Sequence, residues 1–435
     1  MDIKQDLLNR IKTKDLVVGI VGLGYVGLPL LRSFSAKGFR CIGFDQDKSK
    51  IEMLRCGQSY IKHIPVEQIY PGIKSGQVEV TTESAKFGSC DAILIAVPTP
   101  LTVHREPDMQ YVIATAEAIA KHLRPGQVII LESTTYPGTT REVMIPILES
   151  SGFKLERDFM VGYSPEREDP NNPDFTSGNI PKVVGSTSPD GLEVVQNLYD
   201  QIVSKTVPVQ SVEVAEATKL MENIFRAVNI ALVNELKIAF EKMGIDIWEV
   251  IEGSKTKPFG FMPFYPGPGL GGHCIPIDPF YLSWKARQYG VNTRFIELAG
   301  EINRSMTDHV VMRVMEALSD QGKPLKGANI HIMGLAYKPN VDDDRESPSY
   351  YLMEQLEQRG AIVSYHDPHI PVIRPSRLFT KFAGRKSVNL NGIHDLVLIV
   401  TAHDEYADID FYELNIPVVD TRNIVAGKSD LFYKA

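Results

Sequence analysis

The chain has 435 residues, of which 43% are hydrophobic and 23% charged, and 46 Lys and Arg against 54 Asp and Glu leave a formal charge of −8. At about 150 residues per domain, this length and balance predict a soluble globular enzyme of two or three domains. The negative charge argues against a nucleic-acid partner, because no net positive field attracts phosphate backbones.

The compartment follows from what the sequence lacks. The N-terminal segment MDIKQDLLNRIKTK has no apolar signal core, and no apolar run approaches the roughly 20 residues that span a bilayer. The four cysteines, Cys41, Cys56, Cys90 and Cys274, have neither zinc-site spacing nor the density of a disulfide scaffold. We therefore expect a cytoplasmic protein with no membrane insertion and no metal.

Residues 1–205 alternate short apolar runs with helical stretches, and this pattern predicts a parallel sheet with crossover helices. The runs are LVVGIVGLG, FRCIGFD, AILIAVP, QVIILEST, KVVGS and KTVPV. Between Gln210 and Met243 there is neither Gly nor Pro, and apolar residues recur at helical spacing, so one long helix should open a helical middle region, residues 206–320.

A helix of this length is expected to connect two domains and to help form a homodimer or a higher homo-oligomer, although a long core helix with no interface role is an alternative. Strand and helix patterns return in residues 321–435 with ANIHIMGLAY, AIVSYHD, LVLIVT and PVVDTR. The fold class is thus α/β, with a second, smaller α/β domain.

Gly22-Leu23-Gly24-Tyr25-Val26-Gly27 follows an apolar strand and opens a helix, as a dinucleotide-binding turn does. Asp45 ends the next strand, where a carboxylate binds ribose hydroxyls and repels a 2′-phosphate. NAD is therefore the expected cofactor rather than NADP, although nearby Lys48 and Lys50 weaken that preference. Thr99 and Thr134 follow strands of the same sheet and should face the cofactor, unless they are ordinary helix caps.

The segment from Pro266 to Asp278, PGPGLGGHCIPID, is expected to press its backbone against a ligand, because its glycines suit neither helix nor strand packing. If a helix begins near Cys274, the helix dipole favours a thiolate there, and Asp278 lies on the same face. A lone cysteine is more often a small buried residue. His273 beside it does not make a zinc-ligand pair.

An NAD site together with a reactive cysteine indicates a four-electron oxidation of an alcohol to an acid through a thiohemiacetal and a thioester. That chemistry needs an acid–base group, an oxyanion stabiliser and a positioned water. Glu166, in YSPEREDP, is a candidate for the first role. Lys219 and Asn223 lie four residues apart on the long helix, so both project from one face.

These motifs together resemble the UDP-sugar 6-dehydrogenase family, which includes UDP-glucose dehydrogenase and relatives acting on N-acetylated hexosamines. The resemblance covers nearly the whole chain and rests on VGLGYVGLPL, VPTP, ESTTYPGTT, SPERE, AEATKLMEN, PGPGLGGHCIPIDP, GLAYKPNVDDDRESP and VVDTRN, in the family's order. It implies two Rossmann-like, doubly wound domains joined by a long central helix and a helical middle domain, with the C-terminal domain binding the UDP-sugar.

The resemblance also implies residue roles. Cys274 would be the nucleophile, Lys219 and Asn223 would stabilise the oxyanion, Asp278 would support the thiolate or water, Glu166 would serve the acid–base step and Thr134 would hold the water. The predicted cofactor contacts are Gly22, Gly24, Tyr25, Val26, Gly27, Asp45, Lys50, Thr99, Thr134 and Arg345. The predicted substrate contacts are Glu166, Lys219, Asn223, Tyr265, Gly267, Gly269, Gly271, Lys338 and Arg422.

The substrate branch is indicated by a departure from the UDP-glucose enzymes, which usually carry serine before the nucleophile and lysine just before the aspartate. Here those positions hold His273 and Ile277, and GGHCIPID resembles the branch that oxidises UDP-N-acetylhexosamines. UDP-N-acetyl-D-glucosamine is the preferred substrate, with UDP-N-acetylmannosamine, UDP-N-acetylgalactosamine and UDP-glucose as alternatives.

Three other classes of protein remain open. A β-hydroxyacid dehydrogenase of the 6-phosphogluconate type shares the Rossmann start and the helical body but needs no cysteine. A nucleotide-sugar epimerase needs Tyr-x-x-x-Lys on a helix; Tyr70 and Lys74 have that spacing, but Pro71-Gly72 argue against a helix, and Tyr281 with Lys285 lies in the cysteine segment. The third class is a non-catalytic NADH-binding protein.

Overall fold

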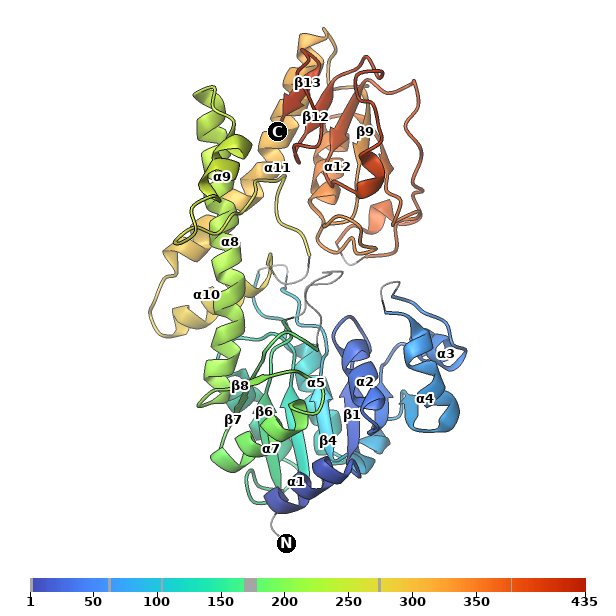
Figure 1. Cartoon of the computed structure of the whole chain (residues 1–435), viewed down its shortest axis with the longest axis vertical. Coiled ribbons are helices and arrows are strands. Elements are labelled where there is room, and N and C mark those ends of the chain that lie inside the picture. Colours follow the sequence, from blue (N-terminus) through green and yellow to red (C-terminus); the bar gives the residue numbers. More distant parts are fainter. Residues whose placement is uncertain (1–2, 62–63, 103–104, 168–177, 273–274, 377) are drawn as a thin grey trace. The chain divides into compact units, whose positions relative to one another are not determined.

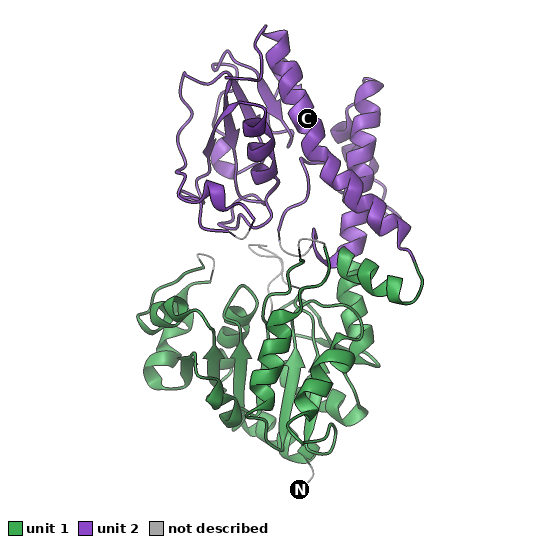
Figure 2. Cartoon of the chain, turned by 180° about the vertical axis from the view of Figure 1, so that it is seen from behind, with its two compact units in different colours: residues 1–222, 280–291 green, residues 223–279, 292–435 purple. Residues whose placement is uncertain are grey.

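The computed structural model describes residues 3–61, 64–102, 105–167, 178–272, 275–376 and 378–435 (Figure 1). The chain divides into two compact units (Figure 2). Unit 1 comprises residues 1–222 and 280–291, and unit 2 comprises residues 223–279 and 292–435. Among the described residues, none of the helices combines the length and the apolar character that crossing a bilayer requires.

Unit 1 is built on an eight-stranded sheet in the order β3-β2-β1-β4-β5-β6-β7-β8. The first six positions follow the strand order of a dinucleotide-binding fold. The strands are β1 (Val17–Val21), β2 (Arg40–Phe44), β3 (Val78–Thr81), β4 (Ala92–Ile95), β5 (Gln127–Leu131), β6 (Phe159–Tyr163), β7 (Lys182–Ser186) and β8 (Thr206–Pro208).

Both faces of this sheet are buried, which is why its strands are almost continuously apolar. Val18 and Ile20 of β1 pack into one core cluster, and Val21 packs into another with Ile93 and Ile95 of β4. The helices of the unit are α1 (Ile3–Thr13), α2 (Gly27–Ala36), α3 (Lys48–Arg55), α4 (Tyr70–Ser75), α5 (Gln110–Ala120), α6 (Ile145–Glu149), α7 (Pro189–Tyr199) and α10 (Asp278–Gln288).

One part of this sheet departs from the predicted parallel arrangement. β7 pairs with β6 in the antiparallel sense, with Gly162 opposite Ser186 and Tyr163 opposite Gly185, while β8 is parallel to β7. Antiparallel neighbours need no crossover helix, and the described residues between these strands, 164–167 and 178–181, form none. The sheet of unit 1 is therefore mixed.

The long helix predicted between Gln210 and Met243 is confirmed as α8 (Val212–Lys242), with 31 residues. Its C-terminal half packs on α9 (Ile247–Ser254) through Val233, Ile247 and Ile251. A helix starting near Cys274 is not observed among the described residues, because 275–277 form a turn and α10 begins at Asp278. Pro276 disfavours a helical conformation in the residue before it, whereas Pro279 fits the first turn of a helix.

Unit 2 carries a five-stranded sheet whose neighbours are all parallel, in the order β10-β9-β11-β12-β13. Its strands are β9 (Asn329–Met333), β10 (Ile362–His366), β11 (Leu396–Ile399), β12 (Val418–Asp420) and β13 (Phe432–Lys434), and α11 (Arg294–Asp320) and α12 (Pro348–Gln358) pack on it. The prediction of an α/β fold with two Rossmann-like sheets and a helical middle region is confirmed, and the antiparallel β6–β7 pair is the exception to the predicted parallel arrangement.

The Tyr-x-x-x-Lys pairs that an epimerase would need lie on helices but are engaged in structural contacts. The expectation that Pro71 prevents a helix was wrong, because Pro71 lies in the first turn of α4, where its missing N–H is not needed. On α10, the Tyr281 hydroxyl donates to the Pro100 carbonyl at 3.1 Å, and Lys285 pairs with Glu142 at 2.6 Å.

Candidate functional site

The glycine turn after β1 has the geometry that a pyrophosphate requires. The Gly22 N–H donates to the Phe44 carbonyl at 2.8 Å, which closes the turn against β2. Apart from Gly24 itself and its chain neighbours, no described residue has an atom within 4 Å of the place where a Cβ on Gly24 would stand, so the backbone there is open to a ligand. Val26 is the N-cap of α2 and makes no side-chain capping bond, so the helix start offers N–H groups to an anion.

Asp45 follows β2 and is held beside this turn. Its carboxylate accepts hydrogen bonds from the backbone N–H of Leu23 at 3.0 Å and of Asp47 at 2.9 Å, and it pairs with the Lys50 ammonium at 3.1 Å. The Lys50 ammonium also lies over the Tyr60 ring, 5.9 Å from its centroid. Tyr25 packs against the core beside the turn. These residues fit an adenosine ribose bound next to the glycine turn.

Two further predicted cofactor residues end neighbouring strands of the same sheet. Thr99 follows β4 and is buried, and Thr134 follows β5 and is half-buried. The Ser133 hydroxyl donates to the Val97 carbonyl at 2.7 Å and so joins the two loops. Carboxyl ends of adjacent parallel strands line the ligand crevice of this fold, so both threonines occupy its edge.

Glu166 and Lys219 are the remaining predicted catalytic residues of unit 1. Glu166 follows β6, accepts the N–H of Arg167 at 2.7 Å and lies 3.5 Å from the Lys182 ammonium. Lys219 on α8 is only 8% exposed, yet within the described part of the chain its ammonium makes no hydrogen bond or ion pair. A lysine whose side chain is mostly buried but whose ammonium has no protein partner can donate to a bound ligand.

In unit 2, the Asn223 amide donates to the Asp278 carboxylate, and both side chains are buried. Asn223 lies one helical turn beyond Lys219 on α8. Asp278 is the first residue of α10, where a carboxylate is favoured by the helix dipole. The Asn223–Asp278 pair therefore fixes the end of the cysteine segment against α8.

The glycine loop of the same segment lies against Arg422, which follows β12. A Cβ on Gly267 would stand 2.6 Å from the Arg422 guanidinium, so the guanidinium lies close against the backbone of the loop. The guanidinium donates through Nε to the Val400 carbonyl at 2.6 Å, and burial lowers the pKa of Arg422 to about 10. The group is still cationic at neutral pH and can bind a phosphate.

The rest of the loop packs on the residues that follow β9. Cβ atoms on Gly271 and Gly272 would meet the Tyr337 side chain, at 2.5 and 3.0 Å, and the Gly272 N–H donates to the Arg345 carbonyl. The Arg345 guanidinium itself pairs with Asp343 at 2.6 Å. Lys338 directly follows Tyr337, so the predicted substrate residues Gly267, Gly269, Gly271, Lys338 and Arg422 all belong to loops of unit 2.

Tyr265 differs from the other predicted substrate residues, because its side chain contacts α9. Its ring stacks on Trp248 at 5.5 Å, and its hydroxyl donates to Glu252 at 2.9 Å. Cys274, the predicted nucleophile, lies outside the described residues. Unit 1 thus contains Glu166, Lys219 and all of the predicted cofactor residues except Arg345. Unit 2 contains the other predicted site residues that the structure describes.

Two asparagines that the sequence reading did not single out hold the glycine loop. The Asn234 carbonyl oxygen accepts the Gly267 N–H at 3.0 Å, and its amide donates to Asn303 at 2.9 Å. Asn303 in turn donates to the Ala227 carbonyl at 3.0 Å. Asn234 lies eleven residues, or three helical turns, beyond Asn223, so the buried polar face of α8 continues to this point. That spacing was the available sequence signal.

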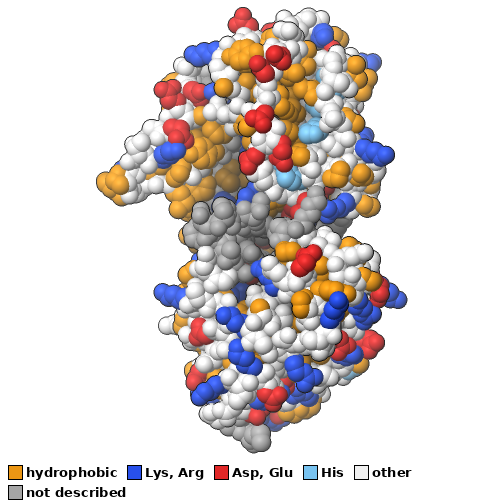
Figure 3. All heavy atoms as spheres, turned by 45° about the vertical axis from the view of Figure 1, so that its right-hand side comes forward, with side chains coloured by type: hydrophobic (Ala, Val, Ile, Leu, Met, Phe, Trp, Pro, Cys, Tyr) orange, Lys and Arg blue, Asp and Glu red, His pale blue; other side chains and the backbone are white. Residues whose placement is uncertain are grey.

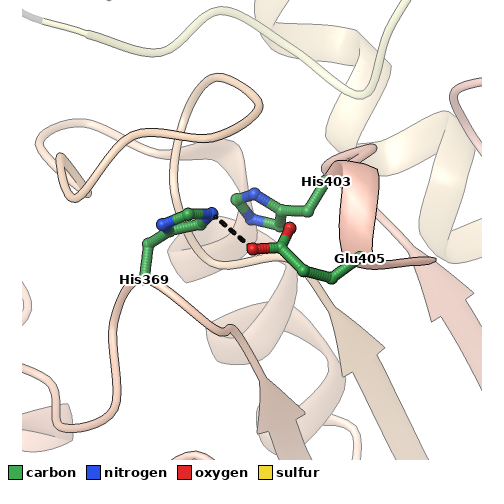
Figure 4. Close-up of side chains that lie close together, drawn as sticks. All are labelled: His369, His403 and Glu405. Atoms are coloured by element: carbon green, nitrogen blue, oxygen red, sulfur yellow. Dashed lines mark ion pairs between the residues drawn. The ribbon is translucent and has the colours of Figure 1, made fainter. Parts of the chain in front are cut away.

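A cluster of His369, His403 and Glu405 in unit 2 has ligand atoms within 4.8 Å of one another (Figure 4). The His403 Nδ1 accepts the Asn340 N–H at 3.0 Å, so its proton is on Nε2, which lies 3.0 Å from Asp367. Both ring nitrogens of His403 are therefore used within the protein, and His369 pairs with Glu405 at 3.3 Å. This donor set does not fit a metal ion, which needs a free nitrogen lone pair.

Fold and site together define the class: an NAD-dependent oxidoreductase with a second nucleotide-binding α/β unit. Family models of UDP-glucose/GDP-mannose dehydrogenases match most of the chain, namely the NAD binding domain over residues 16–203, the central domain over 213–305 and the UDP binding domain over 331–427.

Individual relatives agree with these matches. Protein CapL of Staphylococcus aureus is 36% identical over 90% of this chain and 91% of its own length. A UDP-N-acetyl-D-glucosamine 6-dehydrogenase of Pseudomonas aeruginosa is 34% identical over 91% of this chain and 92% of its own. The solved UDP-D-ManNAc dehydrogenase of Pyrococcus horikoshii superposes with a TM-score of 0.87 at 28% identity, covering 96% of this chain and 98% of that one.

The chain therefore belongs to the UDP-glucose/GDP-mannose dehydrogenase family and is an NAD-dependent UDP-sugar dehydrogenase. The resemblance stated from the sequence motifs and the expected NAD cofactor are confirmed.

Proposed function

We propose that the enzyme oxidises the C6 hydroxyl of a UDP-N-acetylhexosamine, with UDP-N-acetyl-D-glucosamine as the preferred substrate, to the uronic acid. NAD supplies the hydride acceptor in both oxidative steps. The primary alcohol, two NAD⁺ and one water give the carboxylate, two NADH and three protons. Cys274 is the proposed nucleophile that retains the aldehyde between the two oxidations.

In this mechanism the Cys274 thiolate adds to the aldehyde carbon to form a thiohemiacetal. Loss of a hydride from that carbon, and of the hydroxyl proton, leaves a thioester, which water hydrolyses to the acid and the free thiol. Lys219 and Asn223 donate to the oxyanion, Asp278 supports the thiolate or water, Thr134 holds the water, and Glu166 moves the proton.

One observation carries this assignment: the Lys219 side chain is mostly buried, its ammonium makes no bond among the described residues, and it lies one helical turn from Asn223. A donor that is already oriented and has no competing protein partner gains most when negative charge develops on the substrate oxygen. For substrate binding, the position of Gly267 against Arg422 supports a phosphate contact.

The choice of N-acetylglucosamine rests on the motif GGHCIPID and on the relatives. UDP-N-acetyl-D-glucosamine 6-dehydrogenases of Pseudomonas aeruginosa and Salmonella typhi are each 34% identical to this chain. A UDP-N-acetyl-D-mannosamine dehydrogenase of Methanococcus maripaludis and an NDP-N-acetyl-D-galactosaminuronic acid dehydrogenase of Ralstonia solanacearum are each 30% identical. The mannosamine and galactosamine epimers therefore remain the alternatives, together with UDP-glucose.

The deciding experiment is NADH release with UDP-N-acetylglucosamine, its two epimers and UDP-glucose, together with the mass of the product. We expect two NADH per sugar and the greatest kcat/KM with UDP-N-acetylglucosamine. The Cys274→Ala variant should bind NAD but form no acid, and Lys219→Met should lower kcat by about 100-fold or more. One NADH per sugar would indicate a hydroxyacid dehydrogenase, and normal turnover by Cys274→Ala would refute the covalent mechanism.

We also propose that two copies of the chain pair through α8. Val214, Met221, Phe225 and Leu232 recur on one face of this helix and are all exposed, whereas Lys219, Asn223 and Asn234 on another face are buried. Figure 3 shows hydrophobic side chains gathered on the surface at the left of the upper part of its view. A face that meets its own copy forms a closed, isologous dimer.

Sedimentation tests this pairing: Met221→Glu with Leu232→Glu should give a monomer, whereas Val388→Glu, exposed outside the helical region, should leave a dimer. A double variant that is still dimeric would exclude α8 as the interface. A cytoplasmic location stays a prediction of the sequence.

A further inference from the structure

Lys182, a residue that none of the predicted roles includes, lies between two carboxylates in unit 1. It is the first residue of β7, and its side chain is 7% exposed. Its ammonium lies 2.9 Å from Glu132, which follows β5, and 3.5 Å from Glu166, which follows β6. One cation therefore joins the residues that follow β5 and β6 to the first residue of β7.

The antiparallel sense of β7 is what creates this meeting. The register pairs Gly162 with Ser186 and Tyr163 with Gly185, and continuing it past the end of β6 places Glu166 opposite Lys182. Opposite residues of an antiparallel pair have Cβ atoms about 5 Å apart, which suits an ion pair. In a parallel β7, the carboxyl end of the strand would lie there instead.

The two carboxylates that contact Lys182 have different surroundings. Glu132 is completely buried and also accepts the hydroxyl of Tyr199, whose ring lies 5.1 Å from the Lys182 ammonium. Glu166 is 17% exposed and lines a surface hollow with Arg167, Pro181 and Lys182. Lys182 therefore links the fully buried carboxylate to the carboxylate that faces the hollow.

Among the described residues, the titratable groups near Glu166 include the Lys182 ammonium, the Glu132 carboxylate and the Tyr199 phenol. On α8, Glu222 takes the Arg167 guanidinium in a two-point pair at 2.6 and 3.2 Å. Because Arg167 is occupied by Glu222, it gives Glu166 only its backbone N–H. Burial by itself lowers the pKa of Lys182, but Glu132 and Glu166 outweigh it and raise the pKa, so the lysine is charged at neutral pH.

We propose that Lys182 is a positioning residue that orients the Glu166 carboxylate and keeps it ionised for the acid–base step. This inference rests on the proposed function, in which Glu166 moves the proton. A cation held within about 4 Å favours the ionised carboxylate, and a base acts only while it is ionised.

The test compares kcat against pH for three variants of the full-length enzyme, with UDP-N-acetylglucosamine and NAD. Lys182→Met combined with Glu132→Gln removes the cation without leaving a lone buried charge, which keeps the fold attainable. We expect the acid limb of its profile to move up by about one pH unit, which lowers kcat about tenfold at pH values well below the midpoint of that limb. Glu132→Gln alone leaves Glu166 as the carboxylate that pairs with Lys182, so it should move the acid limb to lower pH. Lys182→Arg keeps the positive charge, so its acid limb should lie close to that of the wild type.

Titration of the Glu166 carboxyl by carbon-13 NMR, assigned with Glu166→Gln, gives the same comparison without turnover. A folded double variant whose kcat profile and carboxyl titration both match wild type would overturn the proposal and leave Lys182 a structural ion pair. A shifted titration with an unchanged kcat profile would also overturn it, because Glu166 would then not limit catalysis. A wild-type enzyme that oxidised no UDP-sugar would refute the proposed function instead, while the titration would still decide whether Lys182 controls Glu166.

Discussion

The two α/β units of the chain begin with the same turn but use it differently. In unit 1, Gly22 has a φ of +91° and donates to the carbonyl of Phe44, the last residue of β2. In unit 2, Gly334 has a φ of +92° and donates to the carbonyl of His366, the last residue of β10. In both units the aspartate that follows that strand, Asp45 or Asp367, accepts backbone N–H groups of the turn.

The two aspartates differ in how much of their hydrogen-bond acceptor capacity is already used within the protein. Asp367 accepts the N–H groups of Leu335, Ala336, His369 and Ile370 and pairs with His403, and it is buried. Asp45 accepts two N–H groups and the Lys50 ammonium at the edge of the fold.

The residues two positions after the first glycine differ in the same way. Gly24 borders open space, whereas Ala336 is buried. A dinucleotide site therefore depends on the open second glycine and on the spare acceptor capacity of the carboxylate, and the tight turn alone does not create it.

The largest expected effect tests the shared turn. A Cβ on Gly22 would stand 2.5 Å from the Ala96 carbonyl oxygen, and a Cβ on Gly334 would stand 2.4 Å from the Thr401 side chain. Gly22→Ala and Gly334→Ala should each cost about 3 kcal/mol or more, from left-handed strain plus overpacking. Thermal unfolding measures the loss.

Gly126→Ala and Gly327→Ala are matched controls, because both glycines have positive φ and open space around them. We expect about 1 kcal/mol for each, from strain alone. Equal losses in all four variants would show that the close approach of the strands contributes nothing.

The next effect separates the two aspartates. Asp367→Asn should destabilise unit 2 by about 3 kcal/mol, because buried N–H groups lose their acceptor, and leave NAD affinity unchanged. Asp45→Asn should cost about 1 kcal/mol of stability and weaken NAD binding about tenfold, because a charge-assisted bond to the ribose is lost. Calorimetry measures the NAD affinity of each variant, and thermal unfolding measures its stability. A large loss of NAD affinity in Asp367→Asn would contradict the comparison of the two units.

The smallest effect concerns acid. Burial by itself raises the pKa of Asp367, but the hydrogen bond from His403 and the N–H groups of Ala336 and Leu335 lower it below the ordinary 3.8. A lowered carboxyl pKa stabilises the fold above about pH 4, and the contribution is lost as the pH falls below that value. Below pH 4, the stability difference between unit 2 of the wild type and unit 2 of Asp367→Asn should therefore become smaller. Hydrogen exchange of the backbone amides in β9 and β10 measures this difference. A constant difference down to pH 3 would argue against a charged Asp367.

Local patterns sufficed for much of this protein. The glycine turn with Asp45, the long helix α8 and the alternation of strands and helices could be predicted from the sequence, because each depends on spacing within a short stretch. The Lys219–Asn223 spacing on one helix face belongs to the same group. The conditional helix start near Cys274 is not the one observed: α10 begins at Asp278, because Pro276 disfavours a helical conformation in the residue before it.

What the sequence by itself determined is the cofactor class, the long helix and the family, since these are written in contiguous motifs. Only the tertiary structure decided the antiparallel sense of β7, the contact of Gly267 with Arg422, and the partners of Asp367, Lys182 and Asn234. Those features join residues far apart in the chain, and such pairings depend on how strands and helices pack, which residue spacing does not encode.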